Sequence, residues 1–358
     1  MEFPKDLKSL SRQELESLAV EMRQPSYRGE QIFEWIYGKG ETDFHGMTNL
    51  PKDFREALSR SYRIGSTAVE KIQQSVDGTV KALMVLDSGR HVEAVLIPDI
   101  EDGRARRVTA CVSSQVGCPM ACAFCATGTM GFHENLSAGQ IFDQAWVMNT
   151  VAEQRFGRGL TNIVFMGMGE PLLNYANVVR SVRLIADPGG LGLSERRITI
   201  STVGLARRIR DLANEDLQTK LAVSLHAPTD EKRSRIMPVN RAARTDLTAL
   251  KGALEYYHAN TSSMVTFEYC LFNGVNDTED DALHLADAAS WIPSKVNLIM
   301  YNPVPGLPFT RTPDDRMNRF IELLVKEGVA VTVRRSRGQD IDAACGQLAV
   351  AEPAADAE

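Results

Sequence analysis

From about residue 104 to residue 334, strand-like and helix-like patterns alternate along the chain. Short apolar segments rich in Val and Ile end at glycine or polar turns, and amphipathic stretches separate them. This repetition predicts the α/β class, with a parallel sheet under an outer helical layer that closes into a partial (β/α)6 barrel. The first of the amphipathic stretches after Cys125 is expected to open as a helix with a capping box from Ser137 to Gln140. The expected strands are residues 108–113, 162–166, 197–201, 221–226, 265–269 and 296–300, and residues 329–334 carry the pattern of a further strand.

Several residues with chemically useful side chains follow directly after these expected strands. In α/β barrels, reactive groups gather at the carboxyl ends of the strands, because those ends meet on one face. The pattern therefore predicts that residues far apart in the sequence share one site. They are Cys118, Glu170, Ser201, His226 and Asn302.

The N-terminal part of the chain has a different pattern. Residues 1–62 are typical of short helices, the first of which opens with a capping box from Ser11 to Glu14. Residues 66–98 switch to strand patterns joined by the turn dipeptides Asp77-Gly78 and Ser88-Gly89. We expect a small α+β accessory domain over 1–98, the barrel over 104–340, a C-terminal loop over 341–350 and a disordered acidic tail over 351–358.

Composition excludes some classes of protein. No apolar run approaches the ~20 residues that span a bilayer, and the N-terminus lacks a signal-peptide pattern, so we expect a cytoplasmic protein without a membrane partner. Six cysteines in such a chain favour reduced thiols kept for chemistry. With a formal net charge of −6, any RNA site must be a local basic surface. Candidate clusters for it contain Arg104, Arg106, Arg107, Arg207, Arg208, Arg210, Arg334, Arg335 and Arg337.

Three cysteines lie together just after the first expected strand of the barrel. Cys118, Cys122 and Cys125 form a CxxxCxxC loop, and no further cysteine follows before Cys270. Iron–sulfur clusters and structural zinc normally take four ligands, so a compact set of three suggests a cluster with one iron open to a substrate. The alternative is a zinc site that recruits Cys111 as fourth ligand, although that spacing fits no common zinc pattern.

This spacing, with Phe124 before the last cysteine, resembles the signature of the radical S-adenosylmethionine (SAM) superfamily. The resemblance implies a radical-SAM barrel with one [4Fe-4S] cluster on Cys118, Cys122 and Cys125, whose open iron is chelated by SAM. The segment 167–172, Gly-Met-Gly-Glu-Pro-Leu, resembles the element that holds the SAM amino group, although alone it would be an ordinary strand-end turn. The SAM-binding residues implied in this way are Glu170, Pro171, Ser201, Ser224, Leu225, His226 and Asn302.

Three further residues have the chemistry of catalytic groups. Cys345 lies in a polar, glycine-containing loop after the last strand, which favours an accessible thiol nucleophile. Cys111 lies on the strand that leads into the cysteine loop, and two thiols near one site suggest covalent catalysis with a resolving partner. Glu93 interrupts an apolar strand, where the pattern alone favours an exposed alternate position. Cys270 has no motif around it, and we interpret it as a core residue.

Together these segments resemble the dual-specificity RNA adenine-C2 methyltransferases of the RlmN type over nearly the whole chain. The resemblance rests on residues 111–118, 167–172, 224–228, 302–303 and 337–348. It implies methylation at C2 of an adenine in the peptidyl transferase region of 23S rRNA and of an anticodon-loop-adjacent adenine in tRNA. C2 is an electrophilic, non-acidic carbon that direct displacement on SAM does not methylate, so radical chemistry is required. The resemblance also implies a flavodoxin-like electron donor. We expect the accessory domain over 1–98 to contact the RNA, the loop over 341–350 to be catalytic, and the protein to be a monomer.

The same resemblance implies a role for each catalytic residue and two SAM molecules per turnover. One SAM methylates Cys345, and the second is cleaved reductively to a 5′-deoxyadenosyl radical that takes a hydrogen from the new methyl group. The methylene radical adds to adenine C2, and Glu93 acts as proton acceptor; a carboxyl group in an apolar strand would have the raised pKa that suits this task. Cys111 then attacks the sulfur of Cys345 and leaves a disulfide that must be reduced.

Three alternatives stay open at the level of sequence. An adenine-C8 methyltransferase of the same mechanistic class would share every residue named above. A radical SAM enzyme acting on a small molecule or peptide would use the cluster without Cys345 and Cys111 as catalysts. A zinc-stabilised RNA-binding protein would have no catalytic role at all.

Overall fold

The computed structural model describes residues 5–238 and 245–349. Its N-terminal segment is mainly helical. The predicted capping box is confirmed: the Ser11 side chain accepts the N–H of Glu14, and the Ser11 N–H donates to the Glu14 carboxylate at 2.7 Å. The segment contains β1 (Lys5–Asp6), α1 (Arg12–Glu21), α2 (Tyr27–Phe33), the π-helical turn η1 (Glu34–Gly38), the 3₁₀ turn η2 (Phe44–Gly46), α3 (Lys52–Ser61) and β2 (Tyr62–Arg63).

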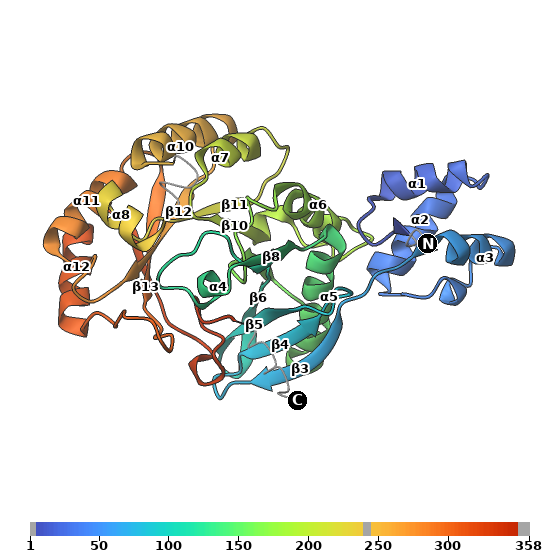
Figure 1. Cartoon of the computed structure of the whole chain (residues 1–358), viewed down its shortest axis with the longest axis horizontal. Coiled ribbons are helices and arrows are strands. Elements are labelled where there is room, and N and C mark those ends of the chain that lie inside the picture. The colour runs from blue at the N-terminus through green and yellow to red at the C-terminus, as the bar shows by residue number, and fades with distance from the viewer. Residues whose placement is uncertain (1–4, 239–244, 350–358) are drawn as a thin grey trace, which may run out of the picture.

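This helical segment packs beside the larger part of the molecule, against helix α5 (Ala138–Phe156) (Figure 1). Lys8 and Asp143 form an ion pair at 2.7 Å with both side chains buried. The ring of Tyr37 meets Phe142 edge-on at 4.9 Å between centroids. Buried charge and aromatic packing therefore attach the two parts to each other.

Ten strands form one continuous sheet within the described residues. Their order is β14-β13-β12-β11-β10-β9-β6-β5-β4-β3, and the neighbours from β14 to β6 are all parallel. The predicted fold class is confirmed, and the strand pattern at residues 329–334 is indeed a further parallel strand. The bounds are β3 (Ala68–Gln74), β4 (Val80–Val85), β5 (His91–Glu101), β6 (Arg104–Cys111), β9 (Asn162–Phe165), β10 (Ile198–Thr202), β11 (Lys220–Ser224), β12 (Val265–Leu271), β13 (Ser294–Met300) and β14 (Val331–Arg334).

The predicted antiparallel strands of residues 66–98 are β3, β4 and β5, and they extend the barrel sheet. β5 pairs antiparallel with β6 from Val95 opposite Cys111 to Glu101 opposite Arg104. These strands were expected in the accessory domain with the N-terminal helices, whereas their hydrogen bonds join them to the barrel. The division of the chain into domains stays a prediction, and the predicted tail at 351–358 lies outside the described residues.

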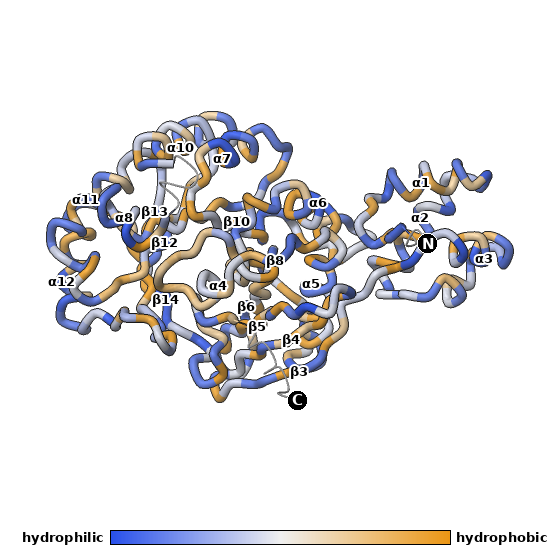
Figure 2. Tube along the Cα trace, viewed as in Figure 1, coloured by the Kyte–Doolittle hydropathy of each residue, from blue (hydrophilic) through white to orange (hydrophobic). Residues whose placement is uncertain are grey.

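Helices cover the outer face of the curved sheet, and the cysteine loop with the short helix α4 lies inside the curve (Figure 1). The second predicted capping box, Ser137 with Gln140, opens α5 as expected. Figure 2 shows hydrophobic residues concentrated along the central strands and hydrophilic ones on the outer helices. The remaining elements are β7 (Gln115–Gly117), α4 (Ala126–Thr129), β8 (Phe132–Asn135), α6 (Tyr175–Ala186), η3 (Glu195–Arg197), α7 (Ala206–Ala213), α8 (Asp230–Ile236), α10 (Leu247–Thr261), α11 (Glu279–Ala289), α12 (Asp314–Lys326) and η4 (Gln339–Ile341).

No helix among the described residues combines the length and the apolar composition needed to cross a lipid bilayer.

Candidate active site

The cysteine loop is shaped by a small hairpin between β7 and β8. Gly117 has a φ of +70°, and a Cβ atom at this position would lie 1.9 Å from the carbonyl oxygen of Gly131. Only glycine allows this backbone approach, which lets the N–H of Cys118 donate to the same carbonyl at 2.7 Å. The hydrogen bond to Gly131 thereby holds the backbone of Cys118 in place.

The far end of the loop is tied to two other parts of the barrel. The N–H of Ala123 donates to the carbonyl of Ile236 in α8 at 2.9 Å. The N–H of Ala126 donates to the carbonyl of Gly346 in the C-terminal loop at 2.8 Å. The loop that carries the cysteines therefore also positions the segment that contains Cys345.

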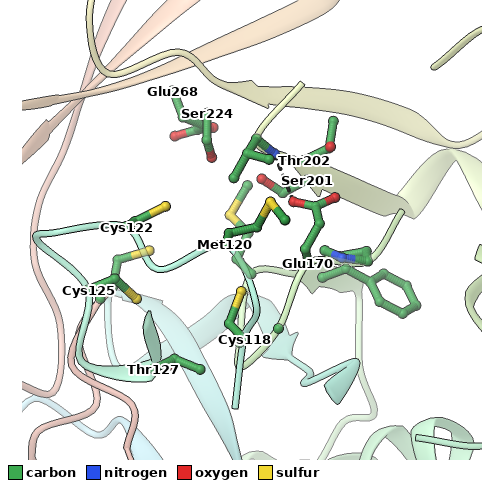
Figure 3. A pocket seen from close by; sticks show the side chains of 18 of the residues that line it. Cys118, Met120, Cys122, Cys125, Thr127, Glu170, Ser201, Thr202, Ser224 and Glu268 are labelled. Carbon is green, nitrogen blue, oxygen red and sulfur yellow. Dashed lines mark hydrogen bonds between the residues drawn. The ribbon is translucent and has the colours of Figure 1, made fainter. Parts of the chain in front are cut away.

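The three cysteines open into a cavity with about 840 Å³ of empty space, counting its open mouth. Figure 3 shows their side chains on one side of it, with Glu170, Ser201, Thr202, Ser224 and Glu268 across from them. The structure thus brings residues from the ends of separate strands to one site, as the sequence predicted. The predicted site residues that line the cavity are Cys118, Cys122, Cys125, Glu170, Pro171, Ser201, Ser224, His226 and Cys345.

The three thiols have the chemistry of iron–sulfur ligands. Burial raises the pKa of Cys118 to about 12 and also raises the pKa values of Cys122 and Cys125. The charge of Cys125 raises the pKa values of Cys118 and Cys122 further, and the charge of Cys345 raises that of Cys125. No group of three or more His, Cys, Asp or Glu side chains among the described residues is gathered tightly enough for a single metal ion. The fit to an iron–sulfur cluster therefore rests on three soft sulfur donors that converge from one loop into one cavity.

Glu170 presents a buried carboxyl group to the same cavity. It accepts the N–H of Leu172 at 3.0 Å and the N–H of Val203 at 2.9 Å, and its side chain is almost completely buried. Burial raises its pKa to about 7, although these hydrogen bonds oppose the shift. Gly169, with a φ of +98°, allows the turn to pack against Gln115, whose side chain accepts the Glu170 N–H at 2.8 Å. A carboxylate held in this way can receive an ammonium group from a ligand.

His226 is a neutral imidazole in this site. Its Nδ1 accepts the backbone N–H of Cys270 at 3.0 Å, so the ring proton must reside on Nε2. Burial, together with the charge of Arg233, lowers its pKa to about 3. Phe124 from the cysteine loop packs edge-on against the ring at 5.0 Å between centroids. The side chain therefore lies between the cysteine loop and the end of β11.

Two of the predicted SAM-binding residues do not line the cavity. The Leu225 side chain is fully buried, and its N–H donates to the carbonyl of Glu268 at 3.0 Å. Asn302 contacts the C-terminal loop: its Nδ2 lies 3.4 Å from the carbonyl of Cys345, and its Oδ1 accepts from Gln339 at 2.7 Å. In this structure Asn302 holds the backbone of Cys345 in place.

Cys345 lines the cavity as a half-buried thiol, and Cys111 lies behind it at the end of β6. Burial and the charge of Cys345 raise the pKa of Cys111 to about 12, so the two sulfurs lie within electrostatic reach of each other. Cys270 is buried, as interpreted from the sequence, and the charge of Cys345 also acts on it. All six cysteines lie within the described residues as free thiols.

The exposed position favoured for Glu93 by the strand pattern is wrong. Its side chain is buried and forms an ion pair with Lys81 at 2.9 Å. β5 is an inner strand of the sheet with both faces covered, so an alternating pattern does not mark a solvent face there. Burial raises the pKa of Glu93, while Lys81 opposes the shift.

Glu93 lies outside the main cavity, beneath the C-terminal loop. Asp342 acts on it electrostatically, and the backbone N–H of Ala349 faces it. Its Oε2 makes no hydrogen bond of good geometry with any described residue. An unsatisfied buried carboxylate oxygen close to the Cys345 loop is a suitable proton acceptor.

Sequence reasoning missed one charged residue of the cavity. Glu268 on β12 is buried, lines the cavity beside Ser224, and accepts from Asn297 at 2.8 Å (Figure 3). The available signal was the same as for Glu93, a single carboxylate within an apolar strand. Thr202, Val203 and Met166 also line the cavity and carried no motif.

Two family models match the chain. One is the radical SAM superfamily, over residues 112–286, and the other is the ribosomal RNA large subunit methyltransferase N-terminal domain, over residues 5–64. The chain is 60% identical to a probable dual-specificity RNA methyltransferase RlmN from Salinibacter ruber, over 96% of this chain and 94% of that protein. It is 45% identical to the protein of the same name from Thermus thermophilus, over 95% and 93% of the two chains.

The fold also resembles a solved structure over nearly the whole chain. It is the crystal structure of a radical SAM methyltransferase from Sphaerobacter thermophilus, with a TM-score of 0.89 and 44% sequence identity. The match covers 96% of this chain and 99% of that one.

Proposed function

The chain belongs to the RlmN family of radical SAM RNA methyltransferases, and on this basis we propose that it methylates C2 of adenine in 23S rRNA and in tRNA. The proposed targets are an adenine in the peptidyl transferase region and an anticodon-loop-adjacent adenine. The observation that carries the proposal is the meeting of Cys345 with the three-cysteine loop in one cavity, with Cys111 within electrostatic reach of Cys345. The dual-specificity names of the relatives support two classes of RNA substrate.

The cofactors of this family are an iron–sulfur cluster and SAM. We propose a [4Fe-4S] cluster held by Cys118, Cys122 and Cys125, with Glu170 receiving the amino group of SAM. Cluster and SAM together supply the radical chemistry that an unactivated ring carbon requires. Pro171, Ser201, Ser224, Leu225, His226 and Asn302 complete the proposed SAM site, the last of them by holding the Cys345 backbone.

The protein's own residues perform the remaining steps. The Cys345 sulfur takes a methyl group from one of two SAM molecules used per turnover, and it then carries that carbon to adenine C2. Glu93, buried beneath the C-terminal loop with a raised pKa, accepts the C2 proton. Cys111 attacks the sulfur of Cys345, and the two cysteines end as a disulfide.

Four further expectations extend this proposal. We expect a flavodoxin-like electron donor, because the cluster must be reduced in each cycle. We expect the helical segment that matches the methyltransferase N-terminal model to contact RNA. A monomeric state and a cytoplasmic location, where rRNA and tRNA are found, stay predictions.

The mass of the Cys345 peptide tests the proposal most directly. Protein purified without oxygen and incubated with SAM should carry one added methyl group, about 14 Da, on Cys345 and none on Cys270. An unmodified Cys345 in cluster-loaded protein would refute the methyl-carrier role.

Product analysis separates the alternatives. Methylated RNA is digested to nucleosides, which are compared with 2-methyladenosine and 8-methyladenosine standards. The proposal expects the C2 product from wild type and no product from Cys345→Ala. A C8 product would replace the proposed regiochemistry, and full activity of Cys345→Ala would indicate a radical SAM enzyme that uses no carrier cysteine.

A further inference from the structure

Arg334 is a charged residue of the barrel to which the proposed chemistry gives no task. It is the last residue of β14, and its backbone pairs with Ile299, which lines the cavity. Its side chain is half-buried, and Nη1 donates to the sulfur of Met166 at 3.3 Å. Because Met166 also lines the cavity, the guanidinium is directed inward, across the end of the parallel sheet.

The same methionine connects Arg334 with Cys111. The backbone N–H of Met166 faces the Cys111 sulfur, while its side-chain sulfur contacts the guanidinium. Within the described residues, the titratable or charged groups that act on the Cys111 sulfur are Cys345 from the C-terminal loop and Arg334 from β14. β5, which pairs with β6 at this point, contributes Val95 opposite Cys111 and no charge there. Arg334 is therefore the positive charge that acts on the pair formed by Cys111 and Cys345.

Arg334 keeps its charge in this environment. Burial lowers its pKa, but the charges of Cys345, Glu268 and Cys111 outweigh that effect and raise it overall. Glu268 is itself held in place by Asn297, at 2.8 Å. The site thus contains a permanent positive charge facing two thiols and one carboxyl group, all buried or half-buried.

We propose that Arg334 is a positioning residue for the resolving step, where it stabilises the thiolate of Cys111 as that sulfur attacks Cys345. This inference rests on the proposed function, because it assumes that Cys345 carries the methylene carbon to the RNA. In the step, Cys111 first loses its proton. A bond forms between the two sulfurs, the bond from the Cys345 sulfur to the methylene carbon breaks, and its electron pair stays on the carbon. That carbon then takes up one proton and becomes the methyl group, so the protons balance.

The size of the effect follows from thiol chemistry. An opposite charge nearby shifts a pKa by about 1–3 units, and each unit changes the thiolate fraction about tenfold at a pH below the pKa. Nucleophilicity falls as the pKa falls, with a Brønsted coefficient of about 0.4–0.5, which cancels nearly half of that gain. Loss of the Arg334 charge should therefore slow the resolving step by about 3- to 50-fold.

The step can be followed as the lifetime of the covalent protein–RNA adduct. Cluster-loaded enzyme is mixed in single turnover with an end-labelled 23S rRNA fragment, quenched in denaturant, and separated into linked and free RNA. Arg334→Gln should show an adduct that persists about 3- to 50-fold longer than in wild type. Bound iron and sulfide, which depend on the cysteine loop and not on the thiol pair, should be unchanged and thereby report correct folding. The adduct lifetime is measured after the adduct has formed, so it does not depend on the rate of Cys345 methylation.

Charge and pH distinguish this role from a packing role. Arg334→Lys should restore the wild-type lifetime, and raising the pH by about one unit should speed resolution in Arg334→Gln towards the wild-type value. The matched control is Lys326→Gln, which removes an exposed cation at the end of α12, the helix before β14. It should leave the adduct lifetime unchanged.

The outcomes separate this inference from the proposed function. Equal adduct lifetimes in wild type and Arg334→Gln would overturn the role of Arg334, as would a Lys variant as slow as the Gln variant. Cys111→Ala is run in parallel and should accumulate adduct without resolving it. If Cys111→Ala forms no adduct, or releases product normally, the proposed mechanism fails instead.

Discussion

Replacing Lys81 with methionine tests how far the buried ion pair between Lys81 and Glu93 stabilises the protein. The ion pair between Lys81 and Glu93 measures 2.9 Å, and the two side chains are 8% and 6% exposed. Lys81→Met keeps a side chain of similar length but removes the charge that compensates the carboxylate. Glu93 would then be a buried anion whose Oε2 already lacks a good hydrogen bond within the described part of the chain.

The expected loss of stability is large and depends on pH. Removing one partner of a buried ion pair costs about 3–5 kcal/mol, because the other charge stays uncompensated. Burial raises the pKa of Glu93 above its unfolded value, and Lys81 opposes the shift, so Lys81→Met raises the pKa further. The folded protein then binds a proton that the unfolded chain has lost, and its stability falls as pH rises above about 4.3. The penalty should be largest near pH 7.5 and smaller near pH 5.

Urea-induced unfolding at these two pH values measures the effect. Cluster-loaded protein is handled without oxygen, and the free energy of unfolding is taken from tryptophan fluorescence. Lys71→Met is the matched control, because Lys71 lies on the neighbouring strand β3 with an exposed side chain. A penalty for Lys81→Met below about 1 kcal/mol at pH 7.5 would refute this reasoning, since that is the range of an exposed pair. A penalty that stays constant down to pH 5 would refute it as well.

Three other predictions concern the cluster loop, the SAM site and the N-terminal contact. Gly117→Ala should lose bound iron and sulfide in metal analysis, because its Cβ would lie 1.9 Å from the Gly131 carbonyl oxygen. The control Gly131→Ala, at a φ of +71° with no atom within 4 Å of the new Cβ, should keep the cluster and lower the free energy of unfolding by only about 1 kcal/mol. Glu170→Gln should weaken SAM binding in equilibrium dialysis by about tenfold or more. The SAM affinity of wild type should rise with pH through about 7, as Glu170 ionises. A SAM affinity that changes neither with the substitution nor with pH would contradict the role of Glu170. Lys8→Met should destabilise the contact with Asp143 by about 3 kcal/mol and speed proteolysis of the N-terminal helices, and an unchanged cleavage rate would argue that this pair does not hold them.

Local signals in the sequence predicted much of the molecule. The capping boxes at Ser11 and Ser137 open helices as expected, because both partners of each cap lie within one helical turn. The order of strands and helices predicted a parallel sheet, which the structure confirms. The cysteine spacing predicted three ligands on one loop, and these three side chains line one cavity. Each of these signals depends on residues that are close in the chain or on a period that repeats along it.

Tertiary structure decided which side chains surround the reactive groups. Glu93 is buried because β5 pairs with β4 on one side and β6 on the other, inside a sheet covered on both faces. Glu268 and Arg334 reach the site because β12 and β14 end at the same edge as β6, which carries Cys111. Periodicity along a strand shows that its side chains alternate between two faces. It does not show which strands pair with it or which elements pack on those faces. The sequence by itself therefore determined the kinds of chemical group and the barrel that carries them, whereas the charges acting on each group arose only when distant strands were placed side by side.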